Sequence, residues 1–354
     1  MHNQWRSVAL TDVGRKRTEN QDAVYADDVQ RIWLVSDGMG GHADGAAASQ
    51  AIVAAISVLH LSDNLIERVV QIQKALREVN TQLQQHAAQQ LQGQQTGATV
   101  VLLTECHGLA ALLWAGDSRC YGKEPKQIQQ LSWDHSHLRE MVRDGHMTEQ
   151  EAAVSRLSNL ITRAIGPHSD VFFDFIVFRI QPESCFLLCS DGLTNELTDS
   201  QIFAELKRQS DLSTAGDALI QQTLHKGARD NVSVVLVKLQ GDMMSAVPDD
   251  APVTGWNKHL QELNQAAFQN NLDVETYYQH LQNVIPLYQT KQQGNKLPIS
   301  KQEELSKAST LEMKTVDHIV QVDKQVGRNT SWSLWLAIIV LVFIVVAGIL
   351  YLSY

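Results

Sequence analysis

The chain has 354 residues, of which 44% are hydrophobic, so it is long enough for a packed domain with additional segments and is not disordered throughout. Its formal net charge of -10 argues against general nucleic-acid binding, because contacts with a phosphate backbone require a basic face. None of its four cysteines lies in a CxxC metal-binding pattern, and a reduced, cytoplasmic domain is the simplest interpretation.

Short apolar and β-branched runs alternate with helical patterns in the first 240 residues or so. The runs predict strands at residues 31–36, 98–104, 109–115, 172–180, 185–190 and 232–239. Apolar residues at helical spacing predict helices at residues 45–61, 65–91, 200–208 and 214–226. The first two helices are long and successive, which indicates an outer layer that covers a sheet.

The composition changes near Gly241, where a region rich in Gln, Asn and Lys begins. We therefore predict a compact domain at residues 1–240, a polar linker at residues 241–331 and a final apolar segment at residues 332–354. Within the linker, residues 259–288 have a helical pattern and predict a small accessory element.

Residues 332–354 contain no charged side chain. About 22 residues, each rising about 1.5 Å, cross the roughly 30 Å hydrocarbon layer, so the segment predicts a transmembrane helix. A buried core helix is the alternative, but this segment is apolar on every side and aromatic at both ends. Lys324 and Arg328 precede it and no basic residue follows, which predicts a single-pass membrane protein with its large domain in the cytoplasm.

Four aspartates lie beside apolar runs, where strands begin or end. Asp37, Asp117 and Asp191 each follow such a run, and Asp230 precedes another. If these strand ends meet at one rim, the carboxylates repel each other and require protons or cations between them. Oxygen ligands of this kind suit Mg²⁺ or Mn²⁺ better than zinc.

The alternative for single members of this set is ordinary turn chemistry. Asp37 and Asp191 are each followed by glycine, and Asp-Gly is a favoured hairpin-turn dipeptide. Arg17, next to Arg15 and Lys16, reads by itself as a surface charge. The joint occurrence of these residues with the glycine-rich loop at residues 37–42 favours the metal-site interpretation.

An ordered series of motifs covers about the first 240 residues and resembles the metal-dependent protein phosphatase family, also called PPM or type 2C, in its bacterial form. The motifs are RTENQDA from Arg17, LVSDGMGGH from Leu34, GATVVLL from Gly97, AGDSRCY from Ala115, WDHS from Trp133, ITRAIG from Ile161, LLCSDGLTNELTD from Leu187 and ARDNVSVVLV from Ala228. The resemblance implies an α-β-β-α sandwich, in which two antiparallel sheets are flanked by helix pairs and the metal site lies between the sheets at one edge.

The resemblance also implies two Mn²⁺ or Mg²⁺ ions and a weaker third. Asp37 is expected to bridge the first two ions. The ligands that the resemblance implies for these two ions are Asp22, Asp37, the Gly38 carbonyl, Asp191 and Asp230. Asp117 is expected to hold the third ion.

Among the catalytic residues that the resemblance implies, Arg17 matches the arginine that binds phosphate, and its planar fork can contact two phosphoryl oxygens at once. Asp37 and Asp191 are expected to be essential. Met39 stands where eukaryotic members often carry a histidine proposed as general acid. His42 is a nearby candidate for that role, and metal-bound water is the alternative. Residues 137–166 resemble the flap that borders the cleft.

The expected reaction is hydrolysis of phosphoserine and phosphothreonine in proteins by a water that bridges two metal ions. The expected partners are phosphorylated proteins, such as the substrates of a serine/threonine kinase. Two alternatives stay open: a membrane-tethered scaffold with the same fold and no turnover, and a hydrolase of small phosphoesters. The complete set of acidic residues speaks against the first alternative.

Overall fold

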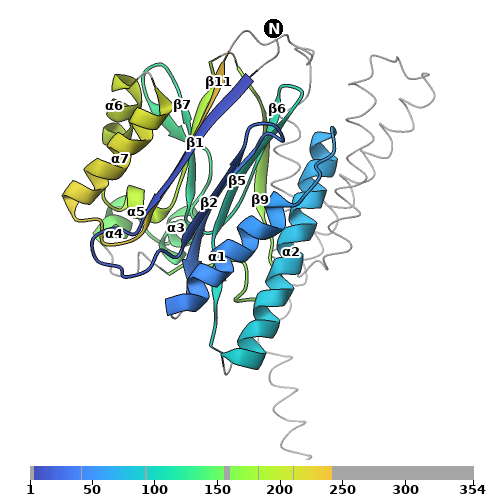
Figure 1. Cartoon of the computed structure of the whole chain (residues 1–354). Coiled ribbons are helices and arrows are strands. Elements are labelled where there is room, and N and C mark those ends of the chain that lie inside the picture. Colours follow the sequence, from blue (N-terminus) through green and yellow to red (C-terminus); the bar gives the residue numbers. More distant parts are fainter. Residues whose placement is uncertain are drawn as a thin grey trace, which may run out of the picture.

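The computed structural model describes residues 4–40, 42–91, 94–154, 160–181, 183–209 and 211–240, and here two antiparallel sheets face each other (Figure 1). The first sheet has the strand order β1 (Gln4–Asp12), β11 (Val232–Gln240), β10 (Cys185–Cys189), β7 (Arg119–Lys123) and β8 (Ile128–Gln130). The second has the order β2 (Asp22–Asp27), β3 (Ile32–Met39), β5 (Val100–Cys106), β6 (Leu109–Ala115) and β9 (Asp174–Arg179), with the short β4 (Gly97–Ala98) paired to β3.

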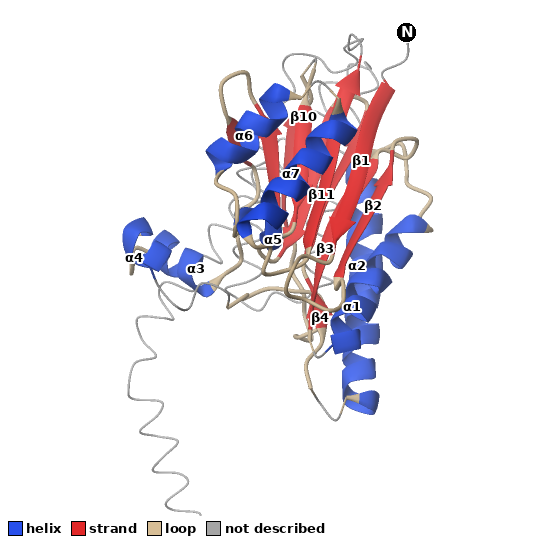
Figure 2. Ribbon diagram, turned by 60° about the vertical axis from the view of Figure 1, so that its left-hand side comes forward, coloured by secondary structure: helices blue, strands red, loops and turns tan. Residues whose placement is uncertain are grey.

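Each sheet carries its own helices on its outer face. The long helices α1 (His42–Ser57) and α2 (Leu65–Gln90) cover the second sheet, and the first is covered by α5 (Asp191–Thr194), α6 (Asp199–Arg208) and α7 (Leu212–Lys226). Two short helices, α3 (His137–Arg143) and α4 (Glu149–Val154), stand away from the sandwich at one end (Figure 2). The predicted arrangement of two antiparallel sheets with covering helices is confirmed.

Strand β3 shows why the central strands read as continuous apolar runs. Ile32 and Leu34 point to α1 and α2, whereas Trp33 and Val35 point to the space between the sheets. All four are at most 1% exposed, because successive side chains of a strand alternate between its two faces and both faces are covered here. Such a strand shows no polar alternation, and length is the main signal that separates it from a helix.

The sequence predicted the long central elements and missed the shorter or more exposed ones. All six predicted strands and all four predicted helices are present, with ends shifted by a few residues. The prediction for residues 98–104 covers two strands, β4 and β5, which are separated at Thr99. The Thr99 N–H donates to the Asp37 carbonyl at 2.8 Å. Strands β1, β2, β7 and β8 were not predicted; they are partly exposed and include polar residues, so their apolar pattern is weak.

The predicted accessory element at residues 259–288 and the predicted transmembrane helix at residues 332–354 lie outside the described residues. Among the helices that the structure does describe, none combines the length and the apolar character that crossing a membrane requires.

The layer between the sheets yields a test of the packing. Trp33 is fully buried, packs against Trp5 at a ring-centroid distance of 5.1 Å, and donates from Nε1 to Asp28 at 2.9 Å. We expect Trp33→Ala to lower the free energy of unfolding by about 3–5 kcal/mol, because it leaves a large cavity. Urea unfolding measures this loss. Val29→Ala is the control: its side chain is 90% exposed, and we expect a change within about 0.5 kcal/mol. Equal losses in both variants would contradict the assigned packing.

Candidate metal centre and active site

The two sheets bring the predicted aspartates to one shared edge. Asp22 opens β2 and lies directly opposite Asp37, near the end of β3. Asp191 begins α5 directly after β10, and Asp230 lies just before β11. Asp117 follows β6. Electrostatic interactions connect the carboxyl groups of all five residues, so the structure gathers the predicted ligand side chains into one cluster.

Two glycines allow the backbone segments of this cluster to approach closely. A Cβ atom added at Gly38 would lie 2.1 Å from the Gly45 carbonyl oxygen, and one added at Gly192 would lie 1.9 Å from the Asn231 carbonyl oxygen. Both distances are far below van der Waals contact, so no other residue fits at either position. Close packing around the acidic residues therefore requires the glycine of each Asp-Gly pair. The preference of Asp-Gly for hairpin turns, which is the alternative explanation, does not account for this requirement.

Several oxygens in the cluster have no hydrogen-bond partner. Within the part of the chain that the structure describes, Asp22 Oδ1, Asp117 Oδ1 and Asp191 Oδ1 are buried and make no hydrogen bond. A buried acceptor without a partner is costly, and a buried carboxylate oxygen more so. Divalent cations that prefer oxygen ligands would supply the missing interaction, so the residues present fit Mg²⁺ or Mn²⁺.

The acidities of these groups reflect the same crowding. Burial, followed by repulsion from Asp191 and Asp230, raises the pKa of Asp22 to about 6. Burial and then Asp191 raise the pKa of Asp117 to about 8. The pKa of Asp37 lies well above its ordinary value, mainly through burial and then through Asp22, and burial also raises the pKa of Asp191. Without cations, the cluster therefore retains protons at pH values where isolated aspartates are ionised.

Arg17, the residue expected to bind phosphate, lies at the rim of the cluster. Its Nη2 donates to Asp230 Oδ2 at 2.8 Å, and its side chain is 50% exposed. The hydrogen bond to Asp230 and the nearby charges of Asp37 and Asp191 raise the pKa of Arg17. The guanidinium group is thus held beside the carboxylates while one side of it stays open to solvent, a position from which it can contact an incoming anion.

A set of uncharged side chains that the sequence analysis missed fixes the acidic residues. Ser190 Oγ donates to Asp22 at 2.8 Å and accepts from the Ser233 N–H at 3.0 Å. Asn231 is 3% exposed and its side chain donates to the Val13 and Glu19 carbonyls, both at 2.9 Å. Ser190 directly precedes Asp191, and Asn231 directly follows Asp230. This position next to an aspartate is the signal that could have identified both residues in the sequence.

His135, within the WDHS motif, orients the turn that carries Asp117. Its Nδ1 accepts the N–H of Gly116 at 3.1 Å, and Nε2 lies 3.2 Å from the Asp174 carboxylate. An acceptor at Nδ1 requires the proton to be at Nε2, where it is donated to Asp174. Arg163 also bonds Asp174, at 2.9 Å, so this buried group fixes the backbone next to Asp117.

Two predicted residues are not settled by the geometry. His42 is the first residue of α1, but its side chain lies outside what the structure describes. The Gly38 N–H donates to the Gln21 carbonyl at 3.1 Å, which ties the loop before Asp22 to β3, and the role of its carbonyl as a ligand stays a prediction. The predicted flap contains α3 and α4.

Comparisons with known proteins agree with this geometry. Residues 14–227 match the family described as protein phosphatase 2C. The serine/threonine phosphatase stp of Listeria innocua is 32% identical over 245 residues, which cover 67% of this chain and 96% of the relative.

Solved structures give the same result. PppA, described as a key regulatory component of T6SS in Pseudomonas aeruginosa, has a TM-score of 0.61 and 32% identity, and the match covers 67% of this chain and 98% of that one. The catalytic domain of the serine/threonine protein phosphatase PstP in complex with two manganese ions has a TM-score of 0.61 and 28% identity over 68% of this chain and all of that one.

The chain therefore belongs to the protein phosphatase 2C family, whose members are metal-dependent. The resemblance inferred from the sequence motifs is confirmed, as is the predicted class of enzyme, a metal-dependent protein serine/threonine phosphatase.

The raised pKa values predict how pH affects the metal-free protein. Asp22 and Asp117 bind protons more tightly in the folded chain than in the unfolded chain, so their stabilising contribution is complete below pH 4 and is lost as pH rises through about 6 and about 8. We expect the melting temperature in chelator to fall between pH 5 and pH 8, by about 2–4 °C per kcal/mol lost. Thermal unfolding followed by circular dichroism measures the trend.

Two controls accompany this measurement. Asp117→Asn removes one of the groups with a raised pKa and should make the pH dependence shallower. Added Mn²⁺ should restore the melting temperature at pH 8. A melting temperature that rises from pH 5 to pH 8 in chelator would contradict the assigned cluster.

Proposed function

We propose that Asp22, Asp37, Asp191 and Asp230 hold two divalent ions and that Arg17 binds the phosphoryl group of phosphoserine or phosphothreonine in protein substrates. The observation that carries this proposal is the convergence of the four carboxyl groups, together with buried oxygens of Asp22 and Asp191 that lack partners. The manganese ions in the PstP catalytic domain support the choice of metal.

Each part of the site has a separate task. The carboxylates hold the cations and fix their positions, because Ser190, Asn231 and the close backbone approaches leave them little freedom. Bound divalent ions supply a reactive water near neutral pH and neutralise charge on the phosphoryl oxygens. Arg17 contributes a planar pair of donors that orients the same oxygens. Catalysis of phosphoryl transfer consists mostly of such positioning and charge stabilisation.

Asp117 is proposed to hold a third, more weakly bound ion. Its Oδ1 is buried without a partner, and burial together with Asp191 raises its pKa to about 8. A group that retains its proton near neutral pH binds a cation only in competition with that proton. The same competition applies to Asp37, whose pKa is also raised, so the weaker occupancy of the third ion rests on the resemblance to the family.

The proposed substrates are phosphoproteins produced by a serine/threonine kinase, and the proposed location is the membrane. Residues 332–354 are uncharged and Lys324 and Arg328 precede them, which supports a single-pass anchor with the phosphatase domain on the cytoplasmic side. All four cysteines of the chain are buried free thiols, which also supports a reducing compartment. Substrates close to the membrane surface would then be favoured.

The central test is removal of one carboxylate. We expect Asp37→Ala and Asp191→Ala to reduce phosphate release from a phosphothreonine peptide to background, because each removes ligands from the cluster. Chelation should abolish activity in the unaltered chain, and Mn²⁺ should restore it. Release of inorganic phosphate is the readout.

Asp217→Ala is the matched control, since this aspartate is exposed on α7, and its activity should match that of the unaltered chain. Full turnover by Asp37→Ala would refute the proposed function. A parallel assay with a small phosphomonoester separates a protein phosphatase from a general phosphoesterase.

Arg17 should affect recognition more than the metal centre. We expect Arg17→Ala to lower kcat/KM by about 10- to 100-fold, the value of a lost charged hydrogen bond. Arg17→Lys keeps the charge without the planar fork and should recover only part of the loss. Steady-state kinetics on the phosphopeptide, with Mn²⁺ affinity measured in parallel, checks this. Unchanged kinetic constants in Arg17→Ala would remove the assigned role.

The anchor is tested by deleting residues 332–354. We expect the shortened chain to move from the membrane fraction to the supernatant after cell fractionation while its activity on a soluble phosphopeptide is retained. Deletion of residues 259–288 is the control and should leave the protein in the membrane fraction. Persistence of the chain without residues 332–354 in washed membranes would contradict the proposed anchor.

A further inference from the structure

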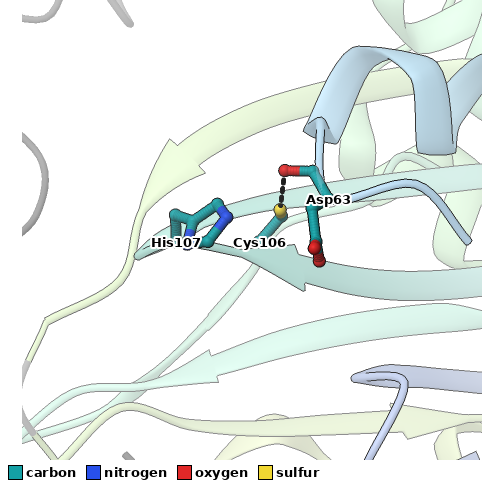
Figure 3. A group of neighbouring side chains, drawn as sticks. All are labelled: Asp63, Cys106 and His107. Carbon is teal, nitrogen blue, oxygen red and sulfur yellow. Dashed lines mark hydrogen bonds between the residues drawn. The ribbon is translucent and has the colours of Figure 1, made fainter. Parts of the chain in front are cut away.

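A second group of potential ligands lies far from the acidic cluster. Strand β5 starts beside Asp37 and ends at Cys106, so the turn that follows lies about 20 Å from the cluster along the strand. At this turn a carboxylate oxygen of Asp63, the sulfur of Cys106 and a ring nitrogen of His107 all lie within 4.8 Å of one another. Figure 3 shows Asp63 and His107 on either side of Cys106.

Arg68 fixes the segment that carries Asp63. Its side chain is 5% exposed, and Nη1 donates to the Gln30 carbonyl at 2.7 Å and to the Glu105 carbonyl at 3.0 Å. Its Nε donates to the Ser62 carbonyl. One buried guanidinium therefore joins the connection between α1 and α2 to the end of β5, and Asp63 is held beside the turn by the packed core.

The turn that carries His107 is also held in a defined conformation. Its two central residues, His107 and Gly108, have φ values of 51° and 85°, the left-handed conformation of a two-residue hairpin turn. The Gly108 N–H donates to the buried Glu105 carboxylate at 2.6 Å, and Trp5 donates to the same carboxylate at 3.0 Å. Asparagine, aspartate and histidine adopt this left-handed conformation more often than other side chains, and the histidine here brings an imidazole beside the thiol.

We propose that Asp63, Cys106 and His107 bind one zinc ion, at a site separate from the phosphatase centre. Sulfur, nitrogen and oxygen donors together favour Zn²⁺, whereas the all-oxygen catalytic cluster favours Mg²⁺ or Mn²⁺. Ligands bonded to one zinc ion at about 2.0–2.3 Å lie about 3.5 Å apart, so zinc binding requires the exposed side chains of Asp63 and His107 to move closer than their present spacing of up to 4.8 Å. Water fills the fourth position.

Zinc binding at this site must displace a proton. Cys106 is 2% exposed, its sulfur donates to the Asp63 carbonyl at 2.9 Å, and burial raises the pKa of its thiol to about 11. The charges that face the thiol are of both signs: Arg68 and Arg31 favour the thiolate, and Glu105 and Asp63 oppose it.

The bound ion would connect the second sheet to the helices that cover it. Asp63 lies two residues before the start of α2, and Cys106 and His107 belong to the β5–β6 hairpin. A ligand that binds only the folded chain raises its stability, so zinc should raise the melting temperature without changing phosphatase turnover.

Cobalt is the probe for this site, since a cobalt–thiolate bond gives a charge-transfer absorption that oxygen ligands do not give. The purified full-length chain is first saturated with Mn²⁺ to fill the acidic cluster and is then titrated with Co²⁺. We expect one equivalent of cobalt to produce the thiolate band and Zn²⁺ to abolish it. Cys106→Ser should lose the band, whereas Cys185→Ser, which alters a buried thiol elsewhere, should retain it.

Two further variants keep the test decisive if Cys106→Ser fails to fold. His107→Asn suits the left-handed turn, and Asp63→Asn preserves shape; each should weaken zinc binding more than the roughly 10- to 100-fold typical of losing an outer-shell partner, with unchanged phosphatase activity. Absence of the cobalt–thiolate band in the unaltered chain at saturating Co²⁺ would overturn the proposal. So would a band that persists in Cys106→Ser, or zinc affinities unchanged in both His107→Asn and Asp63→Asn.

Discussion

The cost of burying several carboxyl groups together, increased by their mutual repulsion, is the constraint on which the rest of this structure depends. Asp22, Asp37, Asp117 and Asp191 all have raised pKa values, and for each of them burial is the largest cause. A chain gains nothing in stability from gathering such groups unless cations or protons lie between them. The arrangement therefore reflects function, and the surrounding sandwich must be stable enough to tolerate it in the absence of metal.

The sandwich meets this demand by drawing the acidic residues from both sheets. Asp22 and Asp37 face each other on neighbouring strands of one sheet, whereas Asp191 and Asp230 adjoin strands of the other. Trp33 and the other apolar residues between the sheets hold the two groups together. The site consequently depends on sheet-to-sheet packing, and changes in that layer are expected to reach the metal ligands without touching them.

The sequence predicted Asp37, Asp117, Asp191 and Asp230 because each adjoins a strand whose apolar run is easily read, whereas Asp22 was expected only from the resemblance of its motif to the family. It did not predict the uncharged supports. Ser190, Asn231 and His135 act through hydrogen bonds to groups that are distant in the chain, such as the 2.8 Å bond from Ser190 to Asp22, and no periodicity encodes such a contact. Strand β2 was missed for a related reason, since it is only partly buried and its pairing with β3 supplies the stability that its composition does not.

The pairing of Arg17 with Asp230 shows how the rim and the centre of the site are coupled. Asp230 is a proposed metal ligand and at the same time the partner of the guanidinium group at 2.8 Å. A cation bound to Asp230 would weaken the attraction between the Asp230 carboxylate and Arg17. The half-exposed Arg17 side chain could then turn its donors toward an anion. If Asp230 and Arg17 have the roles proposed for them, metal occupancy and phosphate recognition are linked through one carboxylate, and a change in either is expected to alter the other even though Arg17 itself binds no metal.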